Sequence, residues 1–237
     1  MEQSDLSRSE LKRAAARYAL EHFVKSGMLV GLGSGSTAEI FVEELAREVG
    51  QGTLTGITAV ATSDKVELMA RTFGITIASL NDVNGLDVTV DGADEIEPRS
   101  FGLLKGRGGA LLREKLVASV SKLEVIIADE SKLVNILGEK MPIPVEVVPF
   151  GWHHTASRLR GIGCEPSLRL KDPLKGIPYL TDSHNYVFDC RFNPITDPVA
   201  LAAAIKNLVG VVEHGIFMGI AGHIVIAGPQ GVYEINH

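Results

Sequence analysis

The sequence predicts an α/β protein with a large domain built on a parallel sheet and a second, smaller α+β domain. Up to Lys132, short apolar runs rich in β-branched residues alternate with helix-length segments, and no hairpin signal separates them. Such alternation indicates parallel strands joined by right-handed crossovers. After Lys132 the pattern changes, because the segment 141–150 carries three prolines and the strand and helix patterns follow in a different order.

The elements of the large domain follow from capping and periodicity. The first helix is predicted to begin at Ser7, where Glu10 completes a capping box, and to end at Gly27. A glycine-rich loop at 33–37 separates the first strand from a helix that runs to about Val49. The predicted strands are 28–32, 57–61, 75–78, 86–90 and 125–128, and two further helices start at Ser63 or Asp64 and at Ala110.

The smaller domain has its own order of elements. Strands are predicted at 145–148, 164–170, 186–192 and 211–217, with helices at 152–160 and 198–208. The order β-α-β-β-α-β is the split unit of ferredoxin-like domains. Two last strand patterns, 223–227 and 232–235, are expected to return to the first sheet. We therefore expect one domain of residues 1–133 and 218–237, with the smaller domain, 134–217, inserted into it.

Composition and charge exclude several classes of protein. The chain has 237 residues and a net charge of -6, which argues against a nucleic acid or an anionic membrane as the main partner. No apolar run approaches the roughly 18 to 20 residues of a membrane helix, and the N-terminus lacks the apolar core of a secretory signal. Two cysteines, Cys164 and Cys190, are too few for a disulfide scaffold, so we expect a cytoplasmic protein.

The loop GLGSGST follows the first strand and opens a helix, an arrangement that directs free backbone amides at an anion. It lacks the third glycine of a dinucleotide fingerprint and the Gly-Lys-Ser/Thr of a nucleotide P-loop. The hydroxyls of Ser34, Ser36 and Thr37, with the turn at Gly35, suit a single phosphate. The alternative is a structural glycine turn in which Ser36 or Thr37 is a plain helix cap.

Two carboxylates, Asp91 and Asp94, flank Gly92 and Ala93 where a buried strand ends, and open α/β sheets bind ligands beyond this end of their strands. A solvated acidic turn is one alternative. A metal site is another, and we expect none, because no accompanying histidine or third well-placed acid appears beside the pair. The adjacent His153 and His154 face different ways on a predicted helix and are expected to be ordinary surface or core residues.

Next along the chain, Lys105 precedes Gly106, Arg107, Gly108 and Gly109. An ammonium and unobstructed backbone amides can stabilise a negative charge that develops during a reaction, although a flexible surface turn is the alternative.

The helix that this loop enters carries Glu114, which is either a surface charge near a helix start or a base that takes a proton from carbon. Lys132, at the end of another strand, and Lys12 are further candidate cations.

Six motifs in order, GLGSGSTA, TSDK, VDGADEIEP, LLKGRGGALLREK, IADESKLV and PIPVEV, resemble those of the A-type ribose-5-phosphate isomerases over nearly the full chain. The resemblance implies an enzyme that interconverts ribose 5-phosphate and ribulose 5-phosphate in the pentose phosphate pathway without metal or cofactor. It also implies a Rossmann-like domain with a smaller ferredoxin-like lid, and a homodimer or homotetramer.

Carried over by position, the resemblance implies that Glu114 is the proton acceptor and that Lys105 with its glycine loop holds the substrate oxygens. It places Ser34 where some relatives have threonine, and Arg107 within a run that is all glycine in some members. The expected substrate-binding residues are Ser34, Gly35, Ser36, Thr37, Asp91, Gly92, Ala93, Asp94, Lys105, Gly106, Arg107, Gly108, Lys132 and Lys12.

The hypothesis for the reaction has three steps. Asp91 or Asp94 opens the sugar ring, Glu114 moves a proton from carbon 2 to carbon 1 through an enediolate, and Lys105 with the loop amides meets the negative charge. Burial is expected to raise the pKa of Glu114 and make it a stronger base. Two other functions are considered, a non-catalytic sugar-phosphate sensor and a nucleotide-linked transferase or dehydrogenase.

Overall fold

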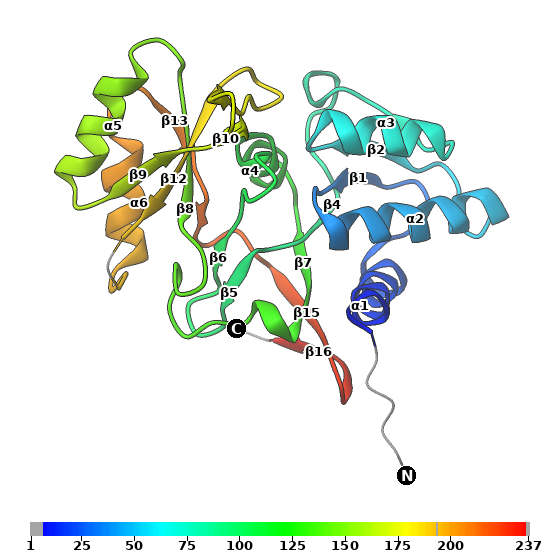
Figure 1. Cartoon of the computed structure of the whole chain (residues 1–237). Coiled ribbons are helices and arrows are strands. Elements are labelled where there is room, and N and C mark those ends of the chain that lie inside the picture. Colours follow the sequence, from blue (N-terminus) through cyan, green and yellow to red (C-terminus); the bar gives the residue numbers. More distant parts are fainter. Residues whose placement is uncertain (1–6, 193, 236–237) are drawn as a thin grey trace. The chain divides into compact units, whose positions relative to one another are not determined.

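The computed structural model describes residues 7–192 and 194–235. The chain divides into two compact units, which we call unit 1 and unit 2 (Figure 1). Unit 1 comprises Met1–Ala93, Arg113–Lys132 and Ile220–His237, and unit 2 comprises Asp94–Leu112 and Leu133–Gly219. The predicted α/β class is confirmed. The predicted domain boundaries stay a prediction, and the units differ from them chiefly because residues 94–112 pack within unit 2.

Unit 1 is built on a seven-stranded sheet of order β16-β15-β7-β4-β1-β2-β3. The pairs from β3 to β15 are parallel, and β16 runs antiparallel to β15. The two C-terminal strands therefore return to the first sheet, as predicted. The strands are β1 Leu29–Leu32, β2 Thr58–Ala61, β3 Thr76–Ile77, β4 Val88–Asp91, β7 Glu124–Asp129, β15 His223–Gly228 and β16 Gly231–Ile235.

Helices cover both faces of this sheet because neighbouring strand residues point to opposite faces. Val30 and Leu32 of β1 are buried in one core cluster with residues of α1 and α2, whereas Leu29 packs in another with Val117 of α4. The helices are α1 Arg8–Phe23, α2 Ser36–Gln51, α3 Asp64–Thr72 and α4 Leu111–Ser119, and short 3₁₀ turns occupy η1 Leu80–Asp82 and η2 Glu130–Lys132.

The capping box of Ser7 and Glu10 is confirmed, but α1 ends at Phe23 and not at Gly27. Val24 already has an extended backbone and is buried, so the helix stops before the glycine turn. None of the helices within residues 7–192 and 194–235 is long and apolar enough to cross a membrane.

Unit 2 contains the predicted β-α-β-β-α-β arrangement. Its four-stranded antiparallel sheet has the order β13-β8-β12-β9, and α5 and α6 lie on the same side of it (Figure 1). Alternate residues of β8, namely Ile143, Val145 and Val147, are buried in one cluster with Leu159 of α5 and Ile205 of α6. The elements are β8 Ile143–Val147, α5 Trp152–Gly161, β9 Glu165–Leu168, β12 Tyr186–Arg191, α6 Pro198–Lys206 and β13 Val211–His214.

Unit 2 also contains strands that the pattern of the sequence did not predict. The expected strand 211–217 is two strands in two sheets, because the chain bends at Gly215, where a Cβ atom would lie 2.2 Å from the carbonyl oxygen of Lys105. The second part, β14 Ile216–Phe217, joins β6 Gly102–Leu104 and β5 Glu95–Glu97 in a three-stranded sheet. A hairpin of β10 Leu170–Asp172 and β11 Ile177–Pro178 lies between β9 and β12 in the chain.

Candidate active site

The glycine loop of unit 1 leads into the start of α2. Gly35 is the N-cap with a φ of 102°, and no side chain caps the helix. The alternative that Ser36 or Thr37 is a plain cap is therefore wrong. Lys12 of α1 places its Nζ atom 2.7 Å from Ser36 Oγ. A cation and the positive end of a helix together favour a bound anion such as a phosphate group.

The Ser34 hydroxyl is directed toward the start of α3. It donates to Ser63 Oγ at 2.8 Å and lies 2.7 Å from Thr62 Oγ1, and Ser63 in turn caps α3. The Thr62 hydroxyl donates to the carbonyl oxygen of Leu32 at 3.0 Å. Sequence reasoning did not assign Thr62 and Ser63, although the TSDK motif contained the signal. These bonds hold the loop and the start of α3 together.

Asp91 lies at the end of β4 and is 1% exposed, so the alternative of a solvated acidic turn is wrong for this residue. Its Oδ1 atom accepts hydrogen bonds from the amides of Ser34 (3.1 Å) and Gly92 (2.7 Å). A Cβ atom on Gly92 would lie 3.9 Å from Thr37 Cβ. The structure thus brings Ser34 and Thr37 of the glycine loop together with Asp91 and Gly92.

Glu114 is 5% exposed in the first turn of α4, so the alternative of a surface charge is wrong. Its neighbour Arg113 forms an ion pair with Asp64 of α3, with Nη1 and Oδ1 2.6 Å apart. Because Ser63 bonds to Ser34 and Asp64 bonds to Arg113, the start of α3 connects the glycine loop to the helix that carries Glu114.

Lys132 is half-buried in the turn η2 that follows β7. Asp129, which is 2% exposed, shapes this turn by accepting hydrogen bonds from the amide of Ser131, at 3.0 Å, and from the Ser131 hydroxyl. The position of Lys132 thus depends on a buried carboxylate that sequence reasoning did not assign. The motif IADESK contained it.

In unit 2, Lys105 is 2% exposed, and its Nζ atom lies 5.7 Å from the centre of the Phe217 ring. The alternative of a solvated lysine on a surface turn is therefore wrong for Lys105. Asp94 accepts a hydrogen bond from the amide of Arg107 at 2.9 Å, which leaves the exposed Arg107 side chain outside that contact. The structure thus brings Asp94 and the loop after Lys105 together within this unit.

Asp94, Lys105, Gly106, Arg107 and Gly108 belong to unit 2, and the other expected site residues belong to unit 1. That all of them bind one substrate stays a prediction. Within residues 7–192 and 194–235, no group of three or more His, Cys, Asp or Glu side chains is placed to hold a metal ion. His153 and His154 are exposed on α5.

Comparison with known proteins decides the family. Residues 58–231 match the sequence profile described as Ribose 5-phosphate isomerase A (phosphoriboisomerase A). Ribose-5-phosphate isomerase A of Synechococcus sp. (strain JA-3-3Ab) is 50% identical over 230 residues, which cover 97% of this chain and 98% of that protein. The chain belongs to the ribose 5-phosphate isomerase A family. A probable ribose-5-phosphate isomerase 2 of Arabidopsis thaliana is 45% identical over 96% of this chain and 87% of its own.

Solved structures of ribose 5-phosphate isomerases have the same fold. That of ribose 5-phosphate isomerase A from Methanocaldococcus jannaschii has a TM-score of 0.91 and 37% identity, covering 98% of this chain and 100% of its own. A D-ribose-5-phosphate isomerase in complex with phospho-erythronic acid has a TM-score of 0.93 and 36% identity, with the same coverage of the two chains. The predicted Rossmann-like class is thereby confirmed.

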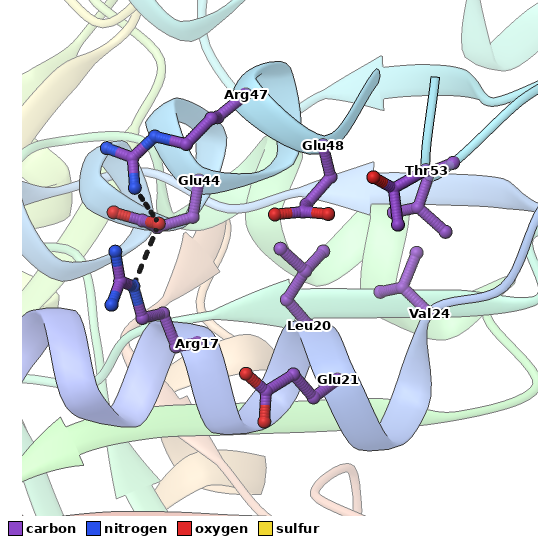
Figure 2. Close-up of a pocket in the computed structure, with 9 residues that line it drawn as sticks. Arg17, Leu20, Glu21, Val24, Glu44, Arg47, Glu48 and Thr53 are labelled. Atoms are coloured by element: carbon purple, nitrogen blue, oxygen red, sulfur yellow. Dashed lines mark hydrogen bonds and ion pairs between the residues drawn. The ribbon is translucent and has the colours of Figure 1, made fainter. Parts of the chain in front are cut away.

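A cavity of about 480 Å³ lies beside α1 and the second half of α2, outside the six motifs of the ribose 5-phosphate isomerase A family (Figure 2). Glu44, which is 3% exposed, bonds there to Arg17 and Arg47, and also to Arg13. Since a helix rises about 1.5 Å per residue, Glu44 lies roughly 12 Å along α2 from Ser36. We interpret this cluster as an ion-pair network that joins the two helices.

Proposed function

We propose that this protein interconverts D-ribose 5-phosphate and D-ribulose 5-phosphate. The observation that carries the proposal is membership of the family, with relatives that match the chain nearly end to end. The position of Lys12 beside the start of α2 supports it, because a cation and a helix N-terminus favour a phosphate group, which both sugars carry.

Glu114 is proposed as the base. The reaction moves one proton from carbon 2 of the open aldose to carbon 1, while the proton of the carbon 2 hydroxyl passes to the carbonyl oxygen of carbon 1. A single carboxylate can take the first proton and return it to the other carbon, with an enediolate between the two steps. Burial of Glu114 supports this role, because a carboxylate shielded from water is a stronger base.

The other expected residues have roles around this step. Lys105 and the amides of its glycine loop are proposed to stabilise the enediolate, and Asp91 or Asp94 to open the sugar ring. The buried state of Lys105 supports its role, since a charge acts more strongly where water is excluded. The phosphate-binding residues are proposed to be Lys12, Lys132 and the loop 34–37.

We also propose a homodimer or homotetramer in the cytoplasm. The free, buried cysteines Cys164 and Cys190 support a reducing compartment. Light scattering on the purified protein measures the assembly, and a monomer at micromolar concentration would contradict this part of the proposal.

The test of the function is conversion of ribose 5-phosphate to ribulose 5-phosphate without added metal or nucleotide. A sugar-phosphate sensor would bind the substrate without converting it, and a nucleotide-linked enzyme would need its nucleotide. Glu114→Gln keeps the shape of the side chain but cannot accept the proton, so kcat should fall by about 100- to 10,000-fold. The matched control is Glu21→Gln, an exposed residue of α1, which should leave kcat unchanged. Near-normal turnover of Glu114→Gln would rule out its role as the base.

A further inference from the structure

Two side chains of unit 2 hold three successive carbonyl groups of the glycine loop. The Nη1 atom of Arg169 donates to the carbonyl oxygens of Gly106 (3.1 Å) and Arg107 (3.0 Å). The hydroxyl of Tyr179 donates to the carbonyl oxygen of Gly108 at 2.9 Å. The six motifs that resemble the family include neither Arg169 nor Tyr179.

These bonds also determine where the amides of the loop point, because the C=O and N–H groups of a planar trans peptide unit point in opposite directions. The amide of Arg107 donates to Asp94, and that of Gly109 donates to the carbonyl oxygen of Gly106 at 3.0 Å. For the amides of Gly106 and Gly108, the described part of the chain offers no hydrogen-bond partner. They are available to an oxygen of a ligand.

Arg169 and Tyr179 are themselves held in place. The Arg169 guanidinium forms two hydrogen bonds with Asp189 of β12, Nε to Oδ2 at 3.0 Å and Nη2 to Oδ1 at 2.5 Å. It lies 5.8 Å from the centre of the Tyr179 ring, and the Tyr179 amide donates to the Arg169 carbonyl oxygen at 2.9 Å. Burial raises the pKa of the Tyr179 hydroxyl, and the charge of Asp182 adds to this effect, so the hydroxyl stays protonated as a donor.

The loop is shaped to receive these side chains. Gly109 has a φ of +83°, and a Cβ atom there would lie 2.4 Å from the Tyr179 hydroxyl oxygen. Gly106 has a φ of +99°. Both glycines are therefore required by the backbone, and at Gly109 a side chain would also displace the donor to Gly108.

We propose that Arg169 and Tyr179, with Asp189 behind them, are positioning residues that hold the peptide units on the two sides of Gly108 and so keep its amide directed toward the charge of the enediolate. The inference rests on the proposed function. A rotated peptide unit would lose its bond to Arg169 or Tyr179 and would present a carbonyl oxygen, which repels that charge. The energetic benefit arises in the transition state, so the residues act on kcat and not on binding of the substrate.

The test compares Tyr179→Phe and Arg169→Gln with controls from the same unit. Loss of a direct donor to a developing charge lowers kcat about 100- to 1000-fold. We expect about 3- to 10-fold for Tyr179→Phe, which frees one carbonyl, and about 10- to 100-fold for Arg169→Gln, which frees two. The controls are Tyr186→Phe and Arg191→Gln, which lie on β12 and make no contact with the loop among the described residues. They should leave kcat unchanged.

Two inhibitors distinguish positioning from a general loss of structure. The carboxylate of phospho-erythronic acid resembles the charged oxygens of the enediolate, so its affinity should fall by the same factor as kcat/KM. The affinity for inorganic phosphate, which unit 1 is proposed to bind, should stay within about twofold. Should Arg169→Gln fail to fold, Tyr179→Phe, which removes one oxygen atom, decides the question.

The possible results separate the inference from the function on which it rests. A wild-type protein without isomerase activity contradicts the proposed function. If the wild type is active, variants whose kcat stays within about twofold of it, or whose only change is a higher KM, overturn the positioning role alone.

Discussion

Glu95 of β5 provides a sharp test of how unit 2 is held together. Its carboxylate is 0% exposed and accepts three backbone hydrogen bonds, from Gly138 at 2.6 Å, Lys140 at 2.7 Å and Met141 at 2.7 Å. The first ends on Oε2 and the other two on Oε1. This one side chain therefore satisfies three amides of a loop more than 40 residues later in the chain.

Glu95→Gln changes one of these contacts from attraction to repulsion. The amide oxygen can replace Oε1 and keep two weaker bonds, but the NH₂ group then faces the N–H of Gly138. Each charge-assisted bond is worth about 1.5 to 3 kcal/mol, and a neutral amide is easier to bury, so we expect a net loss of about 2 to 3 kcal/mol. If the free energy of unfolding falls by about 2 kcal/mol per M of urea, the midpoint of unfolding should fall by about 1 to 1.5 M urea.

The assay is urea unfolding followed by the fluorescence of Trp152, the single tryptophan of the chain, which lies in α5 of unit 2. Glu165→Gln, at an exposed site on β9, is the matched control and should change the stability by less than about 0.5 kcal/mol. If the midpoint of Glu95→Gln stays within about 0.3 M of the wild type, the three bonds do not stabilise the unit as argued.

Two further predictions concern unit 1. Burial alone would raise the pKa of Glu44, but hydrogen bonds from two arginines of α1 lower it below its ordinary value of 4.5. The ionised carboxylate therefore stabilises the folded protein fully above that pH, and this contribution is lost as the pH falls through the lower pKa of the folded state. Glu44→Gln should therefore reduce the free energy of unfolding by about 1 to 3 kcal/mol near neutral pH, which calorimetry detects as a lower melting temperature. The difference from the wild type should shrink in acid, and an equal difference at both pH values would contradict the reasoning. At Gly33 a Cβ atom would lie 2.1 Å from Asp91 Oδ1 and 2.5 Å from Asp91 Cα, so Gly33→Ala should displace the buried carboxylate, lower kcat/KM and destabilise the unit by about 1 to 3 kcal/mol. Gly50→Ala in α2 has open space and should be neutral or stabilising; equal effects of the two alanines on activity would refute the role given to Gly33.

Local signals predicted much of the fold. The capping box at Ser7, the glycine turn before α2 and the alternation of strands and helices in unit 1 each depend on neighbours in the chain, and the structure contains all three. The missed elements, β5, β6 and β14, are strands of two or three residues. Strands this short have too little periodicity to be detected. β5 and β6 pair with each other across a short turn, and β14 pairs with β6 from a distant part of the chain.

The same limit applies to the candidate site. Sequence motifs singled out Lys105, Glu114 and Asp91 and led us to expect burial of Glu114, whereas the structure buries all three. The motifs did not indicate Arg169 and Tyr179, which lie more than 60 residues from the loop carbonyls that they bind. An arginine or tyrosine outside the motifs has no local pattern that reveals its partner, because every residue has a backbone carbonyl and any of them can accept its hydrogen bond.

The sequence by itself determined which residues are candidates for the site and which family the motifs resemble, because spacing along a strand end, a glycine turn or a helix start is local. Only the tertiary structure decided which carboxylates are shielded from water, which hydroxyls are already bonded, and which side chains hold the glycine loop. Burial and hydrogen-bond partners depend on packing between segments that are far apart in the chain, and the reactivity of a carboxylate or an amide depends on that packing.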